Sequence, residues 1–355
     1  MKNQTVTRPL AAVTAFSAMA ALAFSGASPA AAAPPPSGGT GSMDHVGRPF
    51  PPIPNTVGVG PRQDGFWSAY GYSVVNPNVA PPGANDFRCK PREGQNPVVL
   101  LHGTFENGYN TWAGFSPALK KAGYCVFAPY YGRTTFLDRG GLGVVLPSIT
   151  GTGDIGRSAT QVGKYIDRVL KATGAQKVDI IAHSQGGLVA RQWMKFGKAA
   201  SLHAPEKNKI DRLITFGAPN HGTTLLGIAW IGTQMRKAGI DTTGFYSWLY
   251  GQGPIDQMVE SPFVMRLNHY IATYPSVQYT VVGTRYDEVV TPYDSTFLRA
   301  KGVKNITLQD GCPQDTSDHL SMAYSPRAIS IALRALNPQR YPRLVCTANP
   351  WFFSF

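Results

Sequence analysis

Ser184 stands where a strand-like segment meets a helical one, in the sequence AHSQG at 182–186. A chain that turns this sharply needs very small side chains two residues before and two residues after the serine. Ala182 and Gly186 meet that need, although glycine is usual at both places. A hydroxyl held at such a bend can act as a nucleophile, and we prefer this interpretation to that of a helix-capping serine.

A serine hydroxyl is a weak nucleophile until a neighbouring imidazole takes its proton. His319 fits the chain order serine, acid, histidine, because it follows a loop and precedes the last helical segment. His221 comes too soon after Ser184, and we interpret it as a histidine that braces its loop. His102 and His183 lie beside backbone turns, where we expect them to pack beneath the site.

The acid of such a group should end a strand that lies between the serine and the histidine in the chain. Asp287 comes just past a predicted strand, where its carboxylate would orient the imidazole and stabilise its charged form. Glu288 would point elsewhere if Asp287 points in. Asp318 adjoins His319 too closely to reach its ring, and we expect it in solvent. Weaker candidates are Asp256 and Asp294.

Acyl transfer to a serine also needs hydrogen-bond donors for the negatively charged oxygen of the intermediate. One predicted donor is the backbone N–H of Gln185, directly after the nucleophile. The second should come from the loop after the first strand, where Thr104 is our choice and Phe105 the alternative. Chemistry of this kind requires no metal and no organic cofactor.

The elements that would position these residues alternate between short apolar runs and helical patterns. The predicted strands are 97–101, 124–128, 177–182, 210–216 and 277–282, and the predicted helices are 111–122, 154–172, 188–198 and 322–336. This alternation predicts an α/β fold with a mostly parallel sheet and helices on both faces. Residues 221–274 break the rhythm and predict a helical cap insertion. We take residues 88–355 as one catalytic domain with this cap.

Residues 1–33 have the pattern of an export signal, with a positively charged start, an apolar run and small residues for cleavage. No later stretch is apolar for long enough to cross a membrane, so we expect a secreted protein without a transmembrane segment. Residues 34–87 form a leader, rich in proline and glycine, and an N-terminal extension.

The chain is basic, with 33 Lys and Arg against 20 Asp and Glu and a net charge of +13 at pH 7. These basic residues are scattered and no nucleic-acid recognition motif is present, so we expect no nucleic-acid partner. A basic exported protein would favour anionic surfaces. Only 15% of the residues are charged and 11% are aromatic, which argues against disorder. We expect a monomer.

Four cysteines, Cys89, Cys125, Cys312 and Cys346, suggest two disulfides in an exported chain. Three pairings are possible, of which the sequential one closes two loops of similar size. No pair has the spacing CxxC, which argues against redox catalysis and against a zinc site.

Five segments stand out together: VVLLHGT at 98–104, GYCVF at 123–127, AHSQGG at 182–187, APNHGTT at 218–224 and YDEVVTP at 286–292. In this combination they resemble the secreted bacterial class 2 triacylglycerol lipases of the α/β-hydrolase superfamily. The resemblance implies a serine carboxylic ester hydrolase with Ser184, Asp287 and His319 as its catalytic triad.

The substrate is predicted less directly. The apolar run 225–231 in the cap would either pack as an ordinary helix or bind acyl chains at a lipid–water interface. A lipid ester is our hypothesis. The alternatives are a polyester depolymerase, an acyltransferase or a peptidase on the same fold, and a non-catalytic secreted binding protein.

Overall fold

The computed structural model describes residues 52–135, 142–224 and 250–351. The predicted export signal, the start of the leader and the apolar run 225–231 lie outside these residues. Of the predicted cap, residues 221–224 and 250–274 are described.

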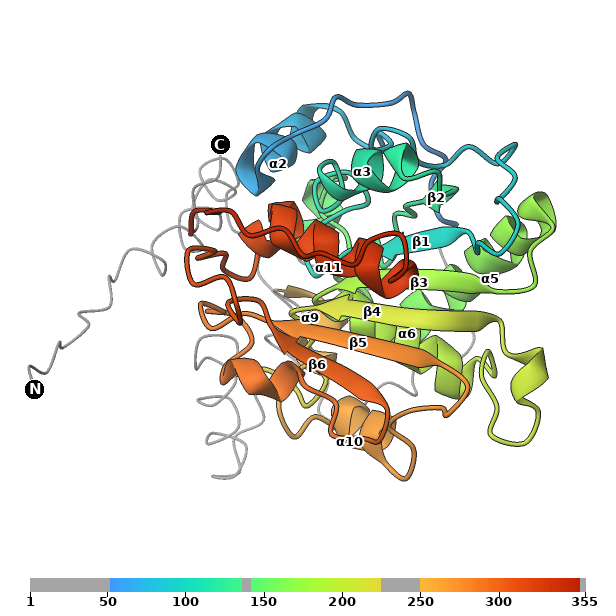
Figure 1. The fold of residues 1–355 in the computed structure, drawn as a ribbon. Coiled ribbons are helices and arrows are strands. Elements are labelled where there is room, and N and C mark those ends of the chain that lie inside the picture. Colours follow the sequence, from blue (N-terminus) through green and yellow to red (C-terminus); the bar gives the residue numbers. More distant parts are fainter. Residues whose placement is uncertain (1–51, 136–141, 225–249, 352–355) are drawn as a thin grey trace, which may run out of the picture. The chain divides into compact units, whose positions relative to one another are not determined.

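A six-stranded parallel sheet forms the centre of the fold, in the strand order β2-β1-β3-β4-β5-β6 (Figure 1). The strands are β1 (Val98–Leu101), β2 (Val126–Phe127), β3 (Val178–His183), β4 (Ile210–Phe216), β5 (Gln278–Gly283) and β6 (Val303–Thr307). The first five match predicted strands. The sixth was not predicted, because its sequence VKNIT is largely polar and only partly buried, as suits the edge of a sheet.

Helices cover both faces of this sheet, as predicted. They are α2 (Phe66–Val75), α3 (Phe115–Lys121), α4 (Leu142–Val145), α5 (Ile155–Thr173), α6 (Gln185–Phe196), α9 (Gln252–Asp256), α10 (Pro262–Asn268) and α11 (Pro326–Leu336). Alternate residues of β1 point to opposite faces: Val99 and Leu101 join the core beneath α5 and α6, whereas Val98 and Leu100 join the core beneath α3 and α11 (Figure 1).

Local signals explain where the helices begin and end. The Asp154 carboxylate caps α5 by accepting a hydrogen bond from Arg157 N at 2.8 Å, and Gly174, at φ +78°, ends the helix. The last helix was predicted from residue 322 but begins at Pro326, because Ser325 caps it and proline favours the first helical position. Residues 321–324 form a separate 3₁₀ turn.

Part of the N-terminal extension packs into the fold. From α2, Phe66 and Ala69 are buried in a cluster with Tyr109 and Tyr324. A Cβ on Gly60 would lie 2.3 Å from the Tyr109 ring, so the chain there approaches the ring too closely for any larger residue. The packed core therefore begins before residue 88.

Two disulfides are present, and they confirm that part of the prediction. Cys89 pairs with Cys125 and Cys312 pairs with Cys346, which is the sequential pairing. The first bond ties the chain before β1 to the start of β2, and the second ties the C-terminal segment to the loop before His319. Among the helices described, none is long and apolar enough to cross a membrane.

The C-terminal segment also braces the loop that leads to His319. Thr316 N donates to Asn349 O at 3.0 Å, and Asn349 Nδ2 donates to Ser317 Oγ at 2.8 Å and to Ser321 O at 3.2 Å. Asn349 lies close to Cys346 in the chain, so the disulfide and these hydrogen bonds hold the same loop.

Candidate active site

Ser184 occupies the bend between β3 and α6, with φ +50° and ψ −125°. A non-glycine residue in this left-handed region costs about 1–3 kcal/mol, so the surrounding structure must impose it. The close packing explains the small residues that follow: a Cβ on Gly186 would lie 2.5 Å from Leu101 O, and one on Gly187 would lie 2.6 Å from Ala218 Cβ. The sharp turn expected from the sequence is therefore present.

His319 and Asp287 form a buried pair. Nδ1 of His319 lies 3.0 Å from Oδ2 of Asp287, while Oδ1 of Asp287 accepts hydrogen bonds from Val289 N at 3.0 Å and Val290 N at 2.7 Å. Burial alone would lower the pKa of His319, but the charge and hydrogen bond of Asp287 outweigh burial and raise it. Since the pair engages Nδ1, Nε2 is the nitrogen left to take a proton.

The segment after β4 brings this pair next to Ser184. Ser184 N donates to Phe216 O at 2.9 Å, and a Cβ on Gly217 would lie 3.1 Å from two atoms of the His319 ring. The His319 ring also lies 4.9 Å, centroid to centroid, from the ring of His183. The structure thus gathers Ser184, Asp287 and His319 at the carboxyl edge of the sheet.

The loop after β1 also lies beside Ser184. A Cβ on Gly103 would be 2.9 Å from Ser184 Cβ. Thr104 Oγ1 accepts hydrogen bonds from Gln185 Nε2 at 2.9 Å and from Gln257 Nε2 at 2.6 Å. The two residues predicted to stabilise an oxyanion, Thr104 and Gln185, are therefore direct neighbours.

Glu106 is a buried carboxylate beneath the site that sequence analysis did not identify. Its Oε2 lies 3.0 Å from His183 Nδ1 and accepts hydrogen bonds from Gly103 N at 2.9 Å and Thr111 Oγ1 at 2.6 Å. Burial would raise the pKa of Glu106, but the attraction of His183 and these hydrogen bonds outweigh it and lower the pKa to about 2.

Two acidic residues next to the site differ from expectation. Glu288 does not point elsewhere: its Oε2 accepts a hydrogen bond from His319 N at 3.3 Å, and burial, Asp318 and Asp287 raise its pKa to about 8. Asp318 is not in solvent but fully buried, with Oδ1 accepting from Leu320 N and from Ser321 N and Oγ. The loop after β6 turns inward at Asp318, because these bonds form a tight cap around its carboxylate.

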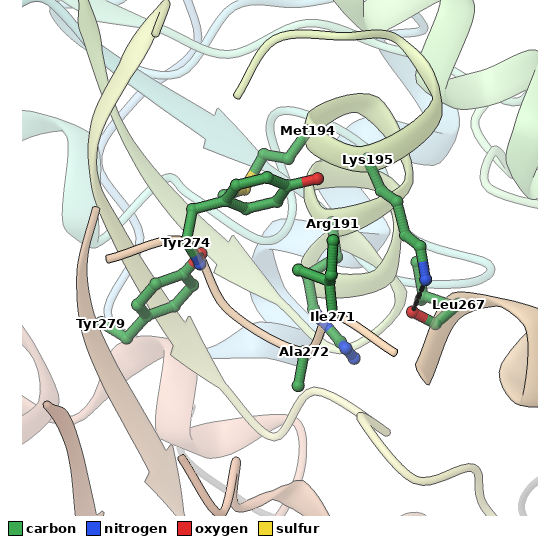
Figure 2. Close-up of a pocket in the computed structure, with 8 residues that line it drawn as sticks. All are labelled: Arg191, Met194, Lys195, Leu267, Ile271, Ala272, Tyr274 and Tyr279. Atoms are coloured by element: carbon green, nitrogen blue, oxygen red, sulfur yellow. Dashed lines mark hydrogen bonds between the residues drawn. The ribbon is translucent and has the colours of Figure 1, made fainter. Parts of the chain in front are cut away.

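A pocket on another part of the molecule contains none of these residues. It is lined by side chains of α6, α10, β5 and the segment between α10 and β5, including Arg191, Tyr274 and Tyr279 (Figure 2). Arg191 is buried there and donates to Asn220 Oδ1 at 3.2 Å and to Asn268 Oδ1 at 2.7 Å. Its contacts join α6 to α10 and to the turn after β4, which is a structural role.

In the described part of the chain, no three His, Cys, Asp or Glu side chains are grouped so that they could hold a metal ion. The side chains brought together are a hydroxyl, an imidazole and a carboxylate, with backbone N–H groups nearby.

Comparisons with known proteins identify the family of the chain. The family model described as "Lipase (class 2)" matches residues 95–323. A triacylglycerol lipase of Pseudomonas fragi is 28% identical over 162 residues, covering 43% of this chain and 46% of that protein. A triacylglycerol lipase of Pseudarthrobacter phenanthrenivorans is 31% identical over 152 residues, covering 41% of this chain and 40% of that protein. The match thus spans less than half the length of each relative.

Among solved structures, lipase B of Aspergillus fumigatus superposes with a TM-score of 0.52 at 20% sequence identity. The superposition covers 75% of this chain and 60% of that one. Together with the parallel sheet and its helices, this likeness confirms the predicted α/β-hydrolase fold.

Proposed function

The chain belongs to the class 2 lipase family, and from that premise we propose that it hydrolyses lipid esters through an acyl-enzyme formed on Ser184. The observation that carries this proposal is the buried Asp287–His319 pair next to a serine held at a strained bend. A pair of this kind provides the base that a serine nucleophile needs.

In the first half of the reaction, Ser184 Oγ attacks the ester carbonyl carbon while His319 Nε2 takes the hydroxyl proton. The carbonyl oxygen becomes an oxyanion, for which we assign the backbone N–H groups of Gln185 and Thr104 as donors. The intermediate then collapses: the bond to the alcohol breaks, His319 gives its proton to the leaving alkoxide, and the acyl group stays on Ser184.

In the second half, His319 takes a proton from a water molecule, whose oxygen attacks the acyl carbon. The second intermediate collapses with release of the carboxylic acid, and Ser184 Oγ regains its proton from His319. Asp287 stays ionised throughout and stabilises the imidazolium that forms twice in each cycle.

We also propose that the protein acts outside the cell that makes it. Two disulfides suit an oxidising compartment, and the first 33 residues have the pattern of an export signal. Sequencing the N-terminus of protein recovered from culture medium would test this, because the proposal requires a new terminus near residues 30–33. An intact Met1 on protein found only inside cells would contradict it.

The central experiment labels the purified protein with a fluorophosphonate and maps the modified peptide. We expect the label on Ser184, and we expect the Ser184→Ala variant to keep its fold while losing both labelling and ester hydrolysis. Labelling at another residue, or full activity of the variant, would overturn the proposed nucleophile.

Substrate class is tested separately by comparing emulsified long-chain triacylglycerol with dissolved short-chain esters. A lipase should hydrolyse the emulsion and gain activity when an interface forms. A preference for short soluble esters, with no gain at an interface, would leave ester hydrolysis in place and remove the lipid substrate. Adding an alcohol or amine acceptor in the same assay separates hydrolysis from acyl transfer.

A further inference from the structure

His183, which directly precedes the nucleophile, has a hydrogen-bond acceptor at each ring nitrogen. Nδ1 lies 3.0 Å from Glu106 Oε2, and Nε2 lies 2.7 Å from the backbone oxygen of His319. A carbonyl oxygen can only accept, so Nε2 must carry a proton. The charge state of the ring therefore depends on whether Glu106 accepts or donates at Nδ1.

The surroundings of Glu106 decide that question. The same oxygen, Oε2, already accepts hydrogen bonds from Gly103 N and Thr111 Oγ1. An oxygen that accepts two such bonds has little capacity to donate a third, whereas a carboxylate oxygen can accept all three. His183 then donates from both nitrogens and is an imidazolium.

A second buried histidine in the site shows that this is not a general consequence of burial. His102 Nδ1 lies 2.8 Å from Gly103 O, to which it donates, but its Nε2 accepts a hydrogen bond from Tyr131 N at 3.3 Å. One donor and one acceptor describe a neutral ring. Burial lowers the pKa of His102 to about 4, in keeping with that state.

We propose that Glu106 and His183 form a buried, charged pair that positions the base His319 for the reaction proposed above. The pair links three parts of the site. Glu106 holds Gly103 in the loop of the predicted oxyanion donor, His183 belongs to the strand that carries Ser184, and the His183 ring holds the backbone oxygen of His319.

With Glu106 ionised, this link also needs a charged ring on His183. A neutral imidazole has one N–H, so it could bind either Glu106 or the His319 carbonyl as a donor, but not both. The side chains of Glu106 and His183 are almost fully buried, at 3% and 0% exposure, where a lost hydrogen bond is not replaced by water. The negative charge of Glu106 also favours the protonated form of His319, whose pKa it helps to raise.

The charge state can be measured without any activity assay. In ¹⁵N–¹H spectra of the folded full chain at pH 7, both ring nitrogens of His183 should carry a proton, while His102 should carry one. In Glu106→Gln, one ring nitrogen of His183 should lose its proton. A singly protonated His183 in the unaltered protein would overturn the proposal.

The positioning role is tested by kinetics on a soluble ester. We expect Glu106→Gln to lower kcat by about 10-fold or more while KM stays within about twofold, because substrate binding surfaces are untouched. The double variant Glu106→Gln/His183→Gln should be no slower than Glu106→Gln alone, since the two residues act as one unit. Additive losses, or an unchanged kcat in Glu106→Gln, would overturn the role.

Asp179→Asn is the matched control. Asp179 is also a buried carboxylate with a cationic partner, Arg212, but it lies at the opposite end of β3 from His183. Its loss should change thermal stability and leave kcat unaltered. If the unaltered protein hydrolyses no ester, the proposed function fails, and the spectra still decide the charge state of the pair.

Discussion

Gln257 and Thr104 join the described part of the cap to the loop after β1. Gln257 Nε2 donates to Thr104 Oγ1 at 2.6 Å, and the same oxygen accepts from Gln185, so the cap contributes a hydrogen bond within the proposed oxyanion region. A segment far along the chain from Thr104 thereby takes part in ordering the loop whose N–H we assign to the oxyanion.

Removing this contact should weaken catalysis more than folding. In Gln257→Ala we expect kcat to fall about 3–10-fold and the free energy of unfolding to fall by about 1 kcal/mol, the usual net worth of one hydrogen bond. Ester hydrolysis and chemical denaturation measure the two effects. Gln252→Ala is the control, because Gln252 donates to Asp256 at 2.9 Å and does not touch Thr104. Equal kcat values in the two variants would show that the contact between Gln257 and Thr104 does not affect catalysis.

Asp287→Asn should abolish most activity while leaving the fold intact. The amide cannot stabilise the imidazolium and can present an N–H to Nδ1, which would leave the wrong ring nitrogen protonated. The corresponding change in a serine protease lowers kcat about 10⁴-fold, and we expect a loss of that order. Asp294→Asn, at a half-exposed carboxylate in the same region, should have little effect. Residual activity above a tenth in Asp287→Asn would mean that another group orients His319.

The rate should depend on pH through His319. The base must be neutral to accept the proton of Ser184, and its pKa is raised above the ordinary value of 6.5. As pH falls through this raised pKa, His319 becomes protonated and kcat/KM declines. We therefore expect the midpoint of the acid limb to lie above 6.5 when initial rates are measured with an ester that does not itself ionise. A midpoint below 6.5 would contradict the assignment.

Glu288 should make the fold less stable as pH rises. Its pKa is about 8 in the folded chain against an ordinary 4.5, so the protonated form stabilises the fold below pH 4.5 and this contribution is lost as pH rises through 8. Glu288→Gln cannot ionise. The free energy of unfolding should therefore fall less between about pH 5 and about pH 9 in the variant, by on the order of 2–4 kcal/mol. The control is Glu93→Gln, at an exposed position, whose free energy of unfolding should depend on pH as in the unaltered protein. If Glu288→Gln shows the same pH dependence as this control, the predicted effect of Glu288 is refuted.

The two disulfides should differ in what they do for catalysis. Removing either pair by Cys→Ser changes should cost about 2–4 kcal/mol of stability. Only Cys312→Ser/Cys346→Ser should also lower kcat at temperatures where the variant stays folded, because that bond lies next to the loop before His319. Cys89→Ser/Cys125→Ser is the matched comparison, as it ties the chain at β2. Equal kcat values for the two variants would show that the second disulfide is only structural.

Much of the framework could be predicted because its signals are local. Apolar runs, a capping aspartate and a helix-ending glycine each act within a few residues of the element that they define, as in β4 and α5. The sharp bend at Ser184 could be predicted in the same way, since steric demands there select small neighbours. The edge strand β6 lacked such a signal, because residues at an edge are only half-buried.

The supporting residues of the site could not be predicted, because they depend on contacts between distant segments. Glu106 meets His183 across 77 positions of sequence, and only the folded sheet places β1 beside β3. The expected positions of Glu288 and Asp318 were inferred from Asp287 and His319, the residues next to them in the chain. The loop turns inward at Asp318 and buries it, so the expectation of a solvated Asp318 was wrong. No pattern in the nearby sequence indicates this turn.

The hydrogen bonds between Asn349 and the loop before His319 connect the formation of the second disulfide to the order of the site. A newly made chain whose thiols are still reduced has no covalent bond to keep this brace in place beside His319. Such a chain should be a poor catalyst in a reducing cytoplasm and gain competence on oxidation.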